Sequence, residues 1–363
     1  MKYGLFLMPL HPPERAKADA YDYDVDSVVL ADQLGYHEAW IGEHFTAVWE
    51  NLPAPDLMIA KLLGLTKNII LGTGVHLLPY HDPMLLAHRV ACLDHLARGR
   101  FYFGVGSGGL PTDFEMFHIN GAEGEQRFRT REALEIILKT WASDEPFDYQ
   151  GRFWRATKPE PRTAGTLGFH MKPFQQPHPP IGVAGLTKGS ETLILAGEMG
   201  LIPLSVHLAT NVVLNHWETV EAGARKTGRT PSRKIWRILR DVYVAETDEQ
   251  ARAEALGGIM GRAFREYFLL LFGAFRVLDL LKQDPNMPDE AVTPEYMADQ
   301  VWAIGSPDTV AKKLRQFYHD VGGFGTVLMV GYDHGQEKAK WQKSLTLFAN
   351  EVMPQLRDLE PVQ

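Results

Sequence analysis

The chain has 363 residues, of which 45% are hydrophobic, and its formal net charge is −8 at pH 7. The acidic balance and the lack of any long Lys/Arg run exclude a nucleic-acid-binding surface, and without a run of about 18 apolar residues no segment is expected to span a membrane. A single cysteine, Cys92, excludes a disulfide framework and a cysteine-based metal site, and it fits a reducing, cytoplasmic location.

Short apolar runs alternate with helical patterns along almost the whole chain, which is typical of βα units. Eight alternations close more naturally as a barrel than as an open sheet, so we expect an α/β fold, with one (β/α)8 barrel domain over residues 1–363. The predicted strands are residues 3–8, 38–41, 68–74, 100–105, 180–184, 201–205, 235–244 and 326–330.

Two stretches interrupt this rhythm and predict insertions over the C-terminal face of the barrel strands. Residues 147–179 are rich in proline and aromatic residues, and residues 248–302 are mostly helical in pattern. Segments this long in a compact domain are usually lids or pocket walls, although disorder is the alternative.

Active sites of such barrels lie at the C-terminal ends of the strands. His44 follows the second predicted strand and could donate a proton or relay one near pH 7, although a histidine there can also be purely structural. His76 and His81 follow the third strand and could line the same pocket. No ligand-pair spacing typical of a metal site occurs, so no metal is expected.

Glycine-rich segments follow the fourth and fifth strands. Residues 104–109 satisfy the letter of the G-x-G-x-x-G pattern, but no helix begins directly after them, so they are a weak dinucleotide fingerprint. Gly106 and Ser107 more naturally let a flat ring or a phosphate approach the backbone. Gly189 and Ser190 open a helix whose amides could bind a phosphate, or Ser190 could be a plain N-cap.

Several segments together resemble the bacterial-luciferase-like flavin-dependent monooxygenase family over essentially the whole chain. Residues 41–46 are similar to its Glu-His segment, residues 71–79 to its third strand, and residues 93–106, the most specific match, to its fourth-strand segment. Residues 172–180 resemble the limonene-monooxygenase-like branch.

The resemblance implies reduced FMN lying against the third and fourth strands, with Gly74, Val75, Gly106 and Ser107 at the cofactor and a cis peptide bond between Gly74 and Val75. It implies that Gly189 and Ser190 bind the FMN phosphate. One departure is that luciferase carries Cys-Arg where this chain has Gly106-Ser107, which removes an arginine from the phosphate.

The implied activity is an FMNH2- and O2-dependent monooxygenation of a small apolar substrate, such as a terpene or a cyclic ketone, through a C4a-(hydro)peroxyflavin. His44 would be the catalytic residue, and a separate NAD(P)H:flavin reductase would supply reduced flavin to a homodimer. Alternatives are an F420-dependent oxidoreductase on the same barrel and a non-catalytic flavin-binding protein. The residues expected at the substrate pocket are His76, His81, Phe45 and Phe114, with Trp49, Phe117, Phe264, Tyr267 and Phe268 as further candidate wall.

Overall fold

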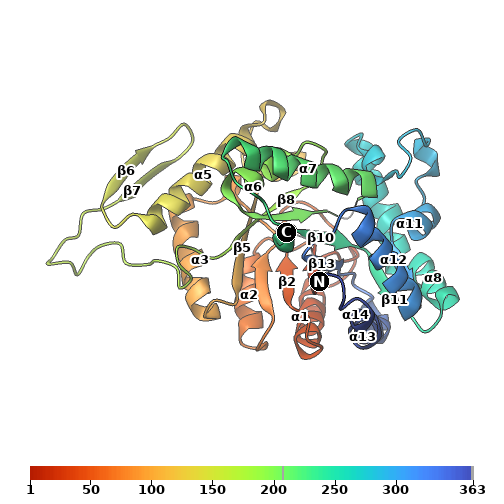
Figure 1. Cartoon of the computed structure of the whole chain (residues 1–363). Helices are drawn as coiled ribbons and strands as arrows, with labels where there is room; N and C mark the ends of the chain where they lie inside the picture. The colour runs from red at the N-terminus through yellow and green to blue at the C-terminus, as the bar shows by residue number, and fades with distance from the viewer. Residues whose placement is uncertain (207, 361–363) are drawn as a thin grey trace.

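The computed structural model describes residues 1–206 and 208–360. Its main sheet is a closed barrel of parallel strands, because the hydrogen-bonded order β3-β2-β1-β13-β10-β9-β8-β5 is completed by pairing of β3 with β5 (Figure 1). A short strand, β4 (His76–Leu77), extends the third position and also pairs with β5. This confirms the predicted (β/α)8 barrel. The eight barrel strands are β1 (Lys2–Leu7), β2 (Glu38–Ile41), β3 (Ile70–Thr73), β5 (Phe101–Gly106), β8 (Ile181–Gly185), β9 (Ile202–Ser205), β10 (Arg237–Arg240) and β13 (Thr326–Val330).

Helices surround the barrel, and none in the described part of the chain is long and apolar enough to cross a membrane. Local signals set their ends: α3 begins after Asp82, whose carboxylate accepts the amide of Leu85, and it ends at Arg98 in the left-handed conformation. The helices are α1 (Lys17–Gln33), α2 (Pro55–Leu63), α3 (Pro83–Ala97), α4 (Pro111–Met116), α5 (Glu125–Ala142), α6 (Glu191–Met199), α7 (Thr210–Lys226), α8 (Asp248–Gly257), α9 (Ile259–Ala263), α10 (Leu269–Ala274), α11 (Pro294–Gln300), α12 (Pro307–Asp320), α13 (Lys338–Leu347) and α14 (Met353–Gln355).

One tryptophan fills much of the barrel interior. The indole of Trp40 is fully buried, and a Cβ atom at Gly72 or Gly182 would lie 2.7 or 2.8 Å from it, so these strand positions need glycine. Trp40 Nε1 donates to the Glu38 carboxylate, which also binds Arg237 across the barrel with contacts of 3.0 and 3.1 Å. Around Trp40 the barrel interior is therefore filled by side chains, and the charges of Glu38 and Arg237 neutralise each other.

The seventh predicted strand, residues 235–244, is not continuous in the structure. It breaks at Asp241: β10 stays in the barrel, whereas β11 (Val242–Val244) leaves it to pair with β12 (Ala303–Gly305). The second insertion, residues 248–302, lies between these two paired strands and contains α8 to α11 together with a π-helical turn, η4 (Phe264–Phe268). Pairing of β11 with β12 thus fixes both ends of the insertion.

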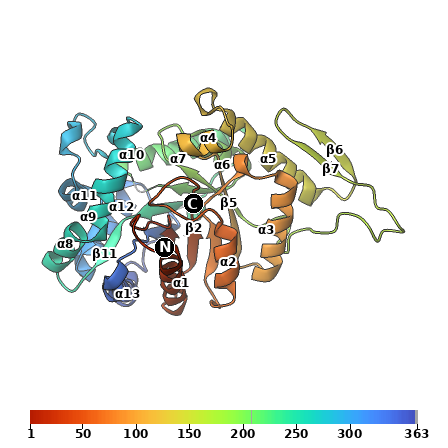
Figure 2. The same cartoon turned by 180° about the vertical axis from the view of Figure 1, so that it is seen from behind.

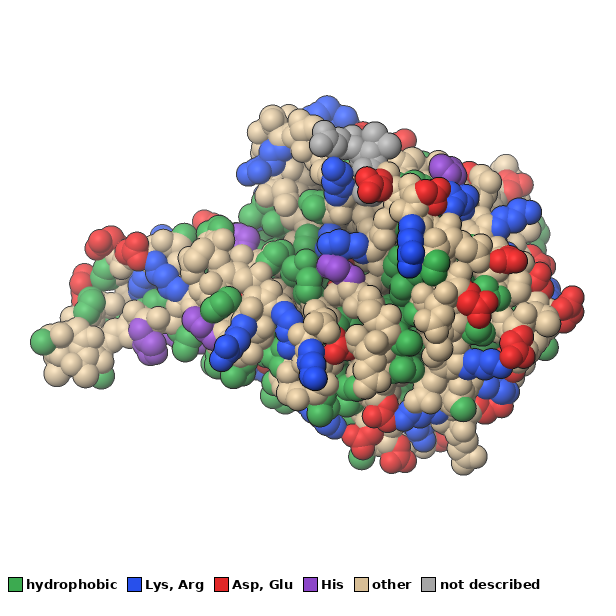
Figure 3. Space-filling view, turned by 60° about the horizontal axis from the view of Figure 1, so that its bottom comes forward, with side chains coloured by type: hydrophobic (Ala, Val, Ile, Leu, Met, Phe, Trp, Pro, Cys, Tyr) green, Lys and Arg blue, Asp and Glu red, His purple; other side chains and the backbone are tan. Residues whose placement is uncertain are grey.

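The first insertion forms an antiparallel hairpin of β6 (Phe147–Gln150) and β7 (Arg155–Lys158). It lies against α5, where the Glu132 carboxylate accepts the amides of residues 152–154. Both cartoon views and the space-filling view show it projecting to one side of the barrel (Figures 1, 2 and 3). This differs from the expected position over the strand ends, because its anchor is a helix of the outer ring.

Candidate active site

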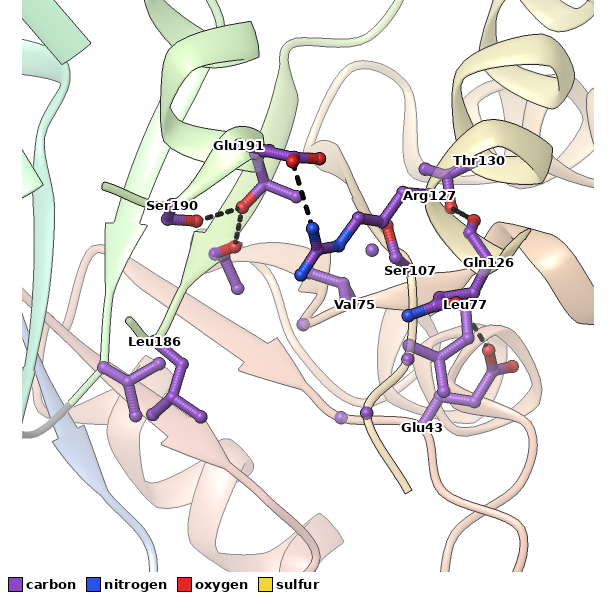
Figure 4. Close-up of a pocket in the computed structure, with 18 of the residues that line it drawn as sticks. Glu43, Val75, Leu77, Ser107, Gln126, Arg127, Thr130, Leu186, Ser190 and Glu191 are labelled. Atoms are coloured by element: carbon purple, nitrogen blue, oxygen red, sulfur yellow. Dashed lines mark hydrogen bonds and ion pairs between the residues drawn. The ribbon is translucent and has the colours of Figure 1, made fainter. Parts of the chain in front are cut away.

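A cavity of about 540 Å³ lies at the C-terminal ends of the barrel strands (Figure 4). Its size is within the range of small-molecule and cofactor sites. The ends of β2, β3, β5 and β8 with the segments after them, together with α5 and α6, supply most of its wall. The lining residues include Phe6, Met8, Gly42, Glu43, His44, Gly74, Val75, Leu77, Gly106, Ser107, Gly108, Gly109, Phe114, Gln126, Arg127, Thr130, Arg131, Ala184, Leu186, Thr187, Ser190, Glu191, Thr192, Leu195, Val206 and Leu239.

Arginine from α5 supplies positive charge to one end of this cavity. Figure 4 shows Arg127 reaching across from α5 towards Glu191 at the start of α6, and Arg127 Nη1 lies 3.0 Å from Glu191 Oε1. Both side chains remain more than half exposed, so the ion pair is weak and open to exchange. Arg131, one helical turn further on, lines the same end. Arginine is thus present at the cavity on a helix, whereas the sequence patterns considered above lie at strand ends.

The start of α6 faces the same end. Ser190 occupies the N-cap position, but its hydroxyl makes no capping bond and instead lies 2.8 Å from Thr192 Oγ1. Thr192 Oγ1 donates to the carbonyl of Ala184 at the end of β8. Ser190 is thus the N-cap residue of α6, but its side chain does not cap the helix. The first amides of α6 are left as donors beside Arg127, whereas the Ser190 hydroxyl donates to Thr192 Oγ1.

The peptide bond between Gly74 and Val75 is cis, as predicted, and both residues line the cavity. The Val75 side chain lies against β5, where a Cβ atom at Gly106 would come within 2.4 Å of Val75 Cγ2. Glycine at position 106 is thus required by this packing contact. Ser107 follows it and lines the cavity without a side-chain partner among the described residues.

His44 lines the cavity from the segment after β2. Its Nε2 atom lies 2.5 Å from the Glu50 carboxylate, whereas its Nδ1 atom is buried and has no hydrogen-bond partner in the described part of the chain. Burial alone would lower the pKa of His44, but the charge and hydrogen bond of Glu50 outweigh burial, and the pKa lies above its ordinary value. The ring is therefore disposed to carry a proton near neutral pH.

His76 and His81 do not line the cavity, in contrast to the expectation. Both imidazoles bind the buried carboxylate of Glu43, at 3.2 Å from His76 Nδ1 and 3.0 Å from His81 Nε2, and the amide of Leu77 donates to the same group. Burial opposes ionisation of Glu43, but these hydrogen bonds and the nearby imidazoles lower its pKa to about 2. The three side chains could converge on a metal, since their ligand atoms lie within 4.8 Å of one another, but the hydrogen bonds account for the cluster.

The other predicted site residues divide in the same way. Phe114 lines the cavity, whereas Gly189 lies outside the lining and its amide donates to Asn215. Phe45 is not among the residues that line the cavity. Its ring packs edge-on against the ring of Phe117, with 4.8 Å between centroids, in an aromatic cluster behind the cavity wall. Tyr80 completes that cluster.

The aromatic residues of the second insertion also lie behind the wall. Phe264 and Phe268 surround a separate small void with Trp302. The ring of Tyr267 stacks on Trp49 at 6.2 Å between centroids, close to Glu50. The sequence predicted that these residues line the pocket. In the structure they pack behind the residues that line it.

Comparison with known proteins gives a consistent result along the chain. A family model described as luciferase-like monooxygenase matches residues 1–323. The 3,6-diketocamphane 1,6-monooxygenase of Pseudomonas putida is 31% identical, over 98% of this chain and 98% of the relative. Limonene 1,2-monooxygenase of Rhodococcus erythropolis is 30% identical, over 99% of this chain and 88% of the relative.

A solved structure is similar throughout. It is a type II Baeyer-Villiger monooxygenase, the oxygenating constituent of 3,6-diketocamphane monooxygenase from Pseudomonas putida, in complex with FMN. It matches with a TM-score of 0.93 and 31% sequence identity, and the match covers 100% of each chain.

Proposed function

Because this chain belongs to the luciferase-like monooxygenase family, we propose that it is the oxygenating component of a monooxygenase that uses reduced FMN and O2 on a small cyclic ketone or terpene. One observation carries the proposal: a single cavity combines an anion-binding end, formed by Arg127 and the start of α6, with His44 and apolar wall. The ketone is favoured because the similar solved structure is a Baeyer-Villiger monooxygenase in complex with FMN.

The residues present fit a flavin mononucleotide. Its phosphate requires hydrogen-bond donors and positive charge, which the first amides of α6 and Arg127 supply, with Ser190 beside them. Its ring needs a flat, largely apolar surface, which Val75, Leu77 and Gly106 supply. The buried Gln126 Oε1 has no partner among the described residues and could accept from a polar edge of the ligand.

When bound, reduced FMN supplies the two electrons that activate O2. The chain contributes binding, exclusion of water and proton control around it. His44 lines the cavity, and its buried Nδ1 atom has no partner among the described residues, so we assign to that atom the donation of a proton to a developing oxyanion or its uptake. The side chains of Phe6, Met8 and Leu239 make the neighbouring wall apolar, which suits a hydrocarbon skeleton.

Two partners belong to the proposal. A separate NAD(P)H:flavin reductase would supply reduced flavin in the cytoplasm, since the similar solved structure is described as an oxygenating constituent. A homodimer is supported by apolar side chains on the outer faces of two neighbouring helices: Leu57 of α2, and Leu85 and Leu96 of α3, are 59 to 67% exposed. Burial of such a stripe against a second copy would remove it from water.

Anaerobic titration with reduced FMN, followed by mixing with oxygenated buffer and a bicyclic ketone, tests the proposal. We expect saturable binding and formation of a lactone that carries one oxygen atom from ¹⁸O2. F420 in place of FMN is the control cofactor and is expected to give neither binding nor product. Reduction of the ketone by reduced F420 would overturn the assignment, and binding of FMN with no turnover of any ketone or terpene would favour a non-catalytic flavoprotein.

A further inference from the structure

A buried carboxylate stands directly behind the histidine of the cavity. Glu50 is 2% exposed, and its Oε2 atom lies 2.5 Å from His44 Nε2. A buried carboxylate is costly unless it is paired and hydrogen-bonded. Because an ionised carboxylate can only accept, the hydrogen of this contact belongs to His44 Nε2.

This contact determines the state of the opposite nitrogen. With Nε2 carrying its hydrogen towards Glu50, the neutral imidazole must have its lone pair at Nδ1. Nδ1 is the atom that has no partner among the described residues. A proton gained or lost by His44 therefore enters or leaves at Nδ1, while Nε2 stays bonded.

A second group holds the carboxylate from the other side. The hydroxyl of Tyr267 donates to Glu50, and the Tyr267 ring stacks on Trp49, the residue next to Glu50 in the chain. Tyr267 lies in the π-helical turn η4, between α9 and α10 of the second insertion. Turns of this kind interrupt α-helices frequently at functional sites. Through this tyrosine the second insertion reaches the site without lining the cavity.

We propose that Glu50 is a positioning residue that fixes the tautomer and orientation of His44, and that Tyr267 fixes Glu50. The role of this arrangement in catalysis rests on the proposed function. The contacts among His44, Glu50 and Tyr267 do not require a bound ligand. Three carboxylates face His44: Glu50 touches the ring, while Asp113 of α4 and Glu43 act at longer range. Asp113 accepts from Thr46 through Oδ1 and Glu43 binds two other histidines, whereas Glu50 is the carboxylate that forms an ion pair with the His44 ring.

Nitrogen-15 NMR of the histidine-labelled protein without flavin tests this arrangement, and His44→Ala identifies the His44 signals by their loss. In the native protein we expect neutral His44 to carry its hydrogen on Nε2 and to titrate above pH 6.5, the ordinary value. Glu50→Gln keeps the size of the side chain and should lower the midpoint of His44 by at least about one pH unit. Tyr267→Phe should lower it less and broaden the tautomer distribution.

Glu14→Gln is the matched control, because it removes one exposed negative charge from the same corner, where Glu14 pairs with Arg262 beside Trp49. It should leave the His44 midpoint unchanged. Hydrogen on Nδ1 in the native protein would overturn the proposal even if Glu50→Gln did not fold, and so would an unchanged midpoint in a folded Glu50→Gln protein. Loss of FMN binding or of turnover in the native protein would refute the proposed function while leaving these NMR results valid.

Discussion

Arg127 is the residue whose replacement tests the proposed anion-binding end of the cavity most directly. Arg127→Gln removes the guanidinium that faces the start of α6 and leaves the helix amides and Ser190 in place. A hydrogen bond to a charged group contributes about 1.5 to 3 kcal/mol. Because Arg127 is 58% exposed and must give up its contact with Glu191, we expect about 1 to 2 kcal/mol here, a rise of about 5- to 30-fold in the Kd of FMN.

The assay is quenching of flavin fluorescence, with FMN and riboflavin titrated in parallel. Riboflavin has the same ring without the phosphate, so Arg127→Gln should leave its Kd within about two-fold. Glu191→Gln should act in the opposite direction and tighten FMN, because it removes a competing negative charge. Arg225→Gln, an exposed arginine of α7 outside the cavity, is the control. Equal weakening of both flavins by Arg127→Gln, or no weakening of FMN, would refute the reasoning.

Three further outcomes are expected. His44→Gln should keep FMN affinity and lower oxygenation by about 10² to 10⁴, the range of one acid-base group, as measured by product formation under saturating reduced flavin; full turnover would remove His44 from the reaction. Leu96→Glu should turn a dimer into a monomer in light scattering, since it places a charge within the apolar stripe of α3, whereas an unchanged mass would place any interface elsewhere. His11 lies between Asp24 and Asp333; burial opposes its charge, but the aspartates raise its pKa to about 9. Its contribution to stability is complete below about pH 6.5 and is lost as the pH rises through about 9, so the free energy of unfolding should fall by up to about 3 kcal/mol in that window, and His11→Gln should lack this slope in denaturant titrations.

The barrel could be predicted because each strand is a short buried run followed by a helical pattern. The break at Asp241 could not, because residues 237–244 are buried throughout, and β10 and β11 differ in the strand that pairs with each. The side position of the β6-β7 hairpin depends on its contacts with α5, such as those of Glu132 with the backbone of residues 152–154 and of Glu135 with Tyr149, which leave no pattern in the sequence.

The site shows the same division. Residues at strand ends, such as His44, Val75 and Ser107, could be found because the fold dictates where strand ends meet. Arg127 was missed because it projects from α5, which is separated from the end of β5 by residues 107–124. Glu50 was missed because the loop after β2 folds back on itself, so that the carboxylate six residues beyond His44 lies behind the ring.

The ion pair between Glu38 and Arg237 has a consequence for how the chain folds. The two residues are 199 positions apart and lie in β2 and β10, and both are buried at the same level of the barrel. A partner left alone in such a pair typically destabilises the protein by about 3 to 5 kcal/mol. Neither the first five strands nor the last three can therefore bury this level of the interior alone. Closure of the barrel is therefore expected to be cooperative, because β2 can bury Glu38 at low cost only when β10, far along the chain, brings Arg237 to it.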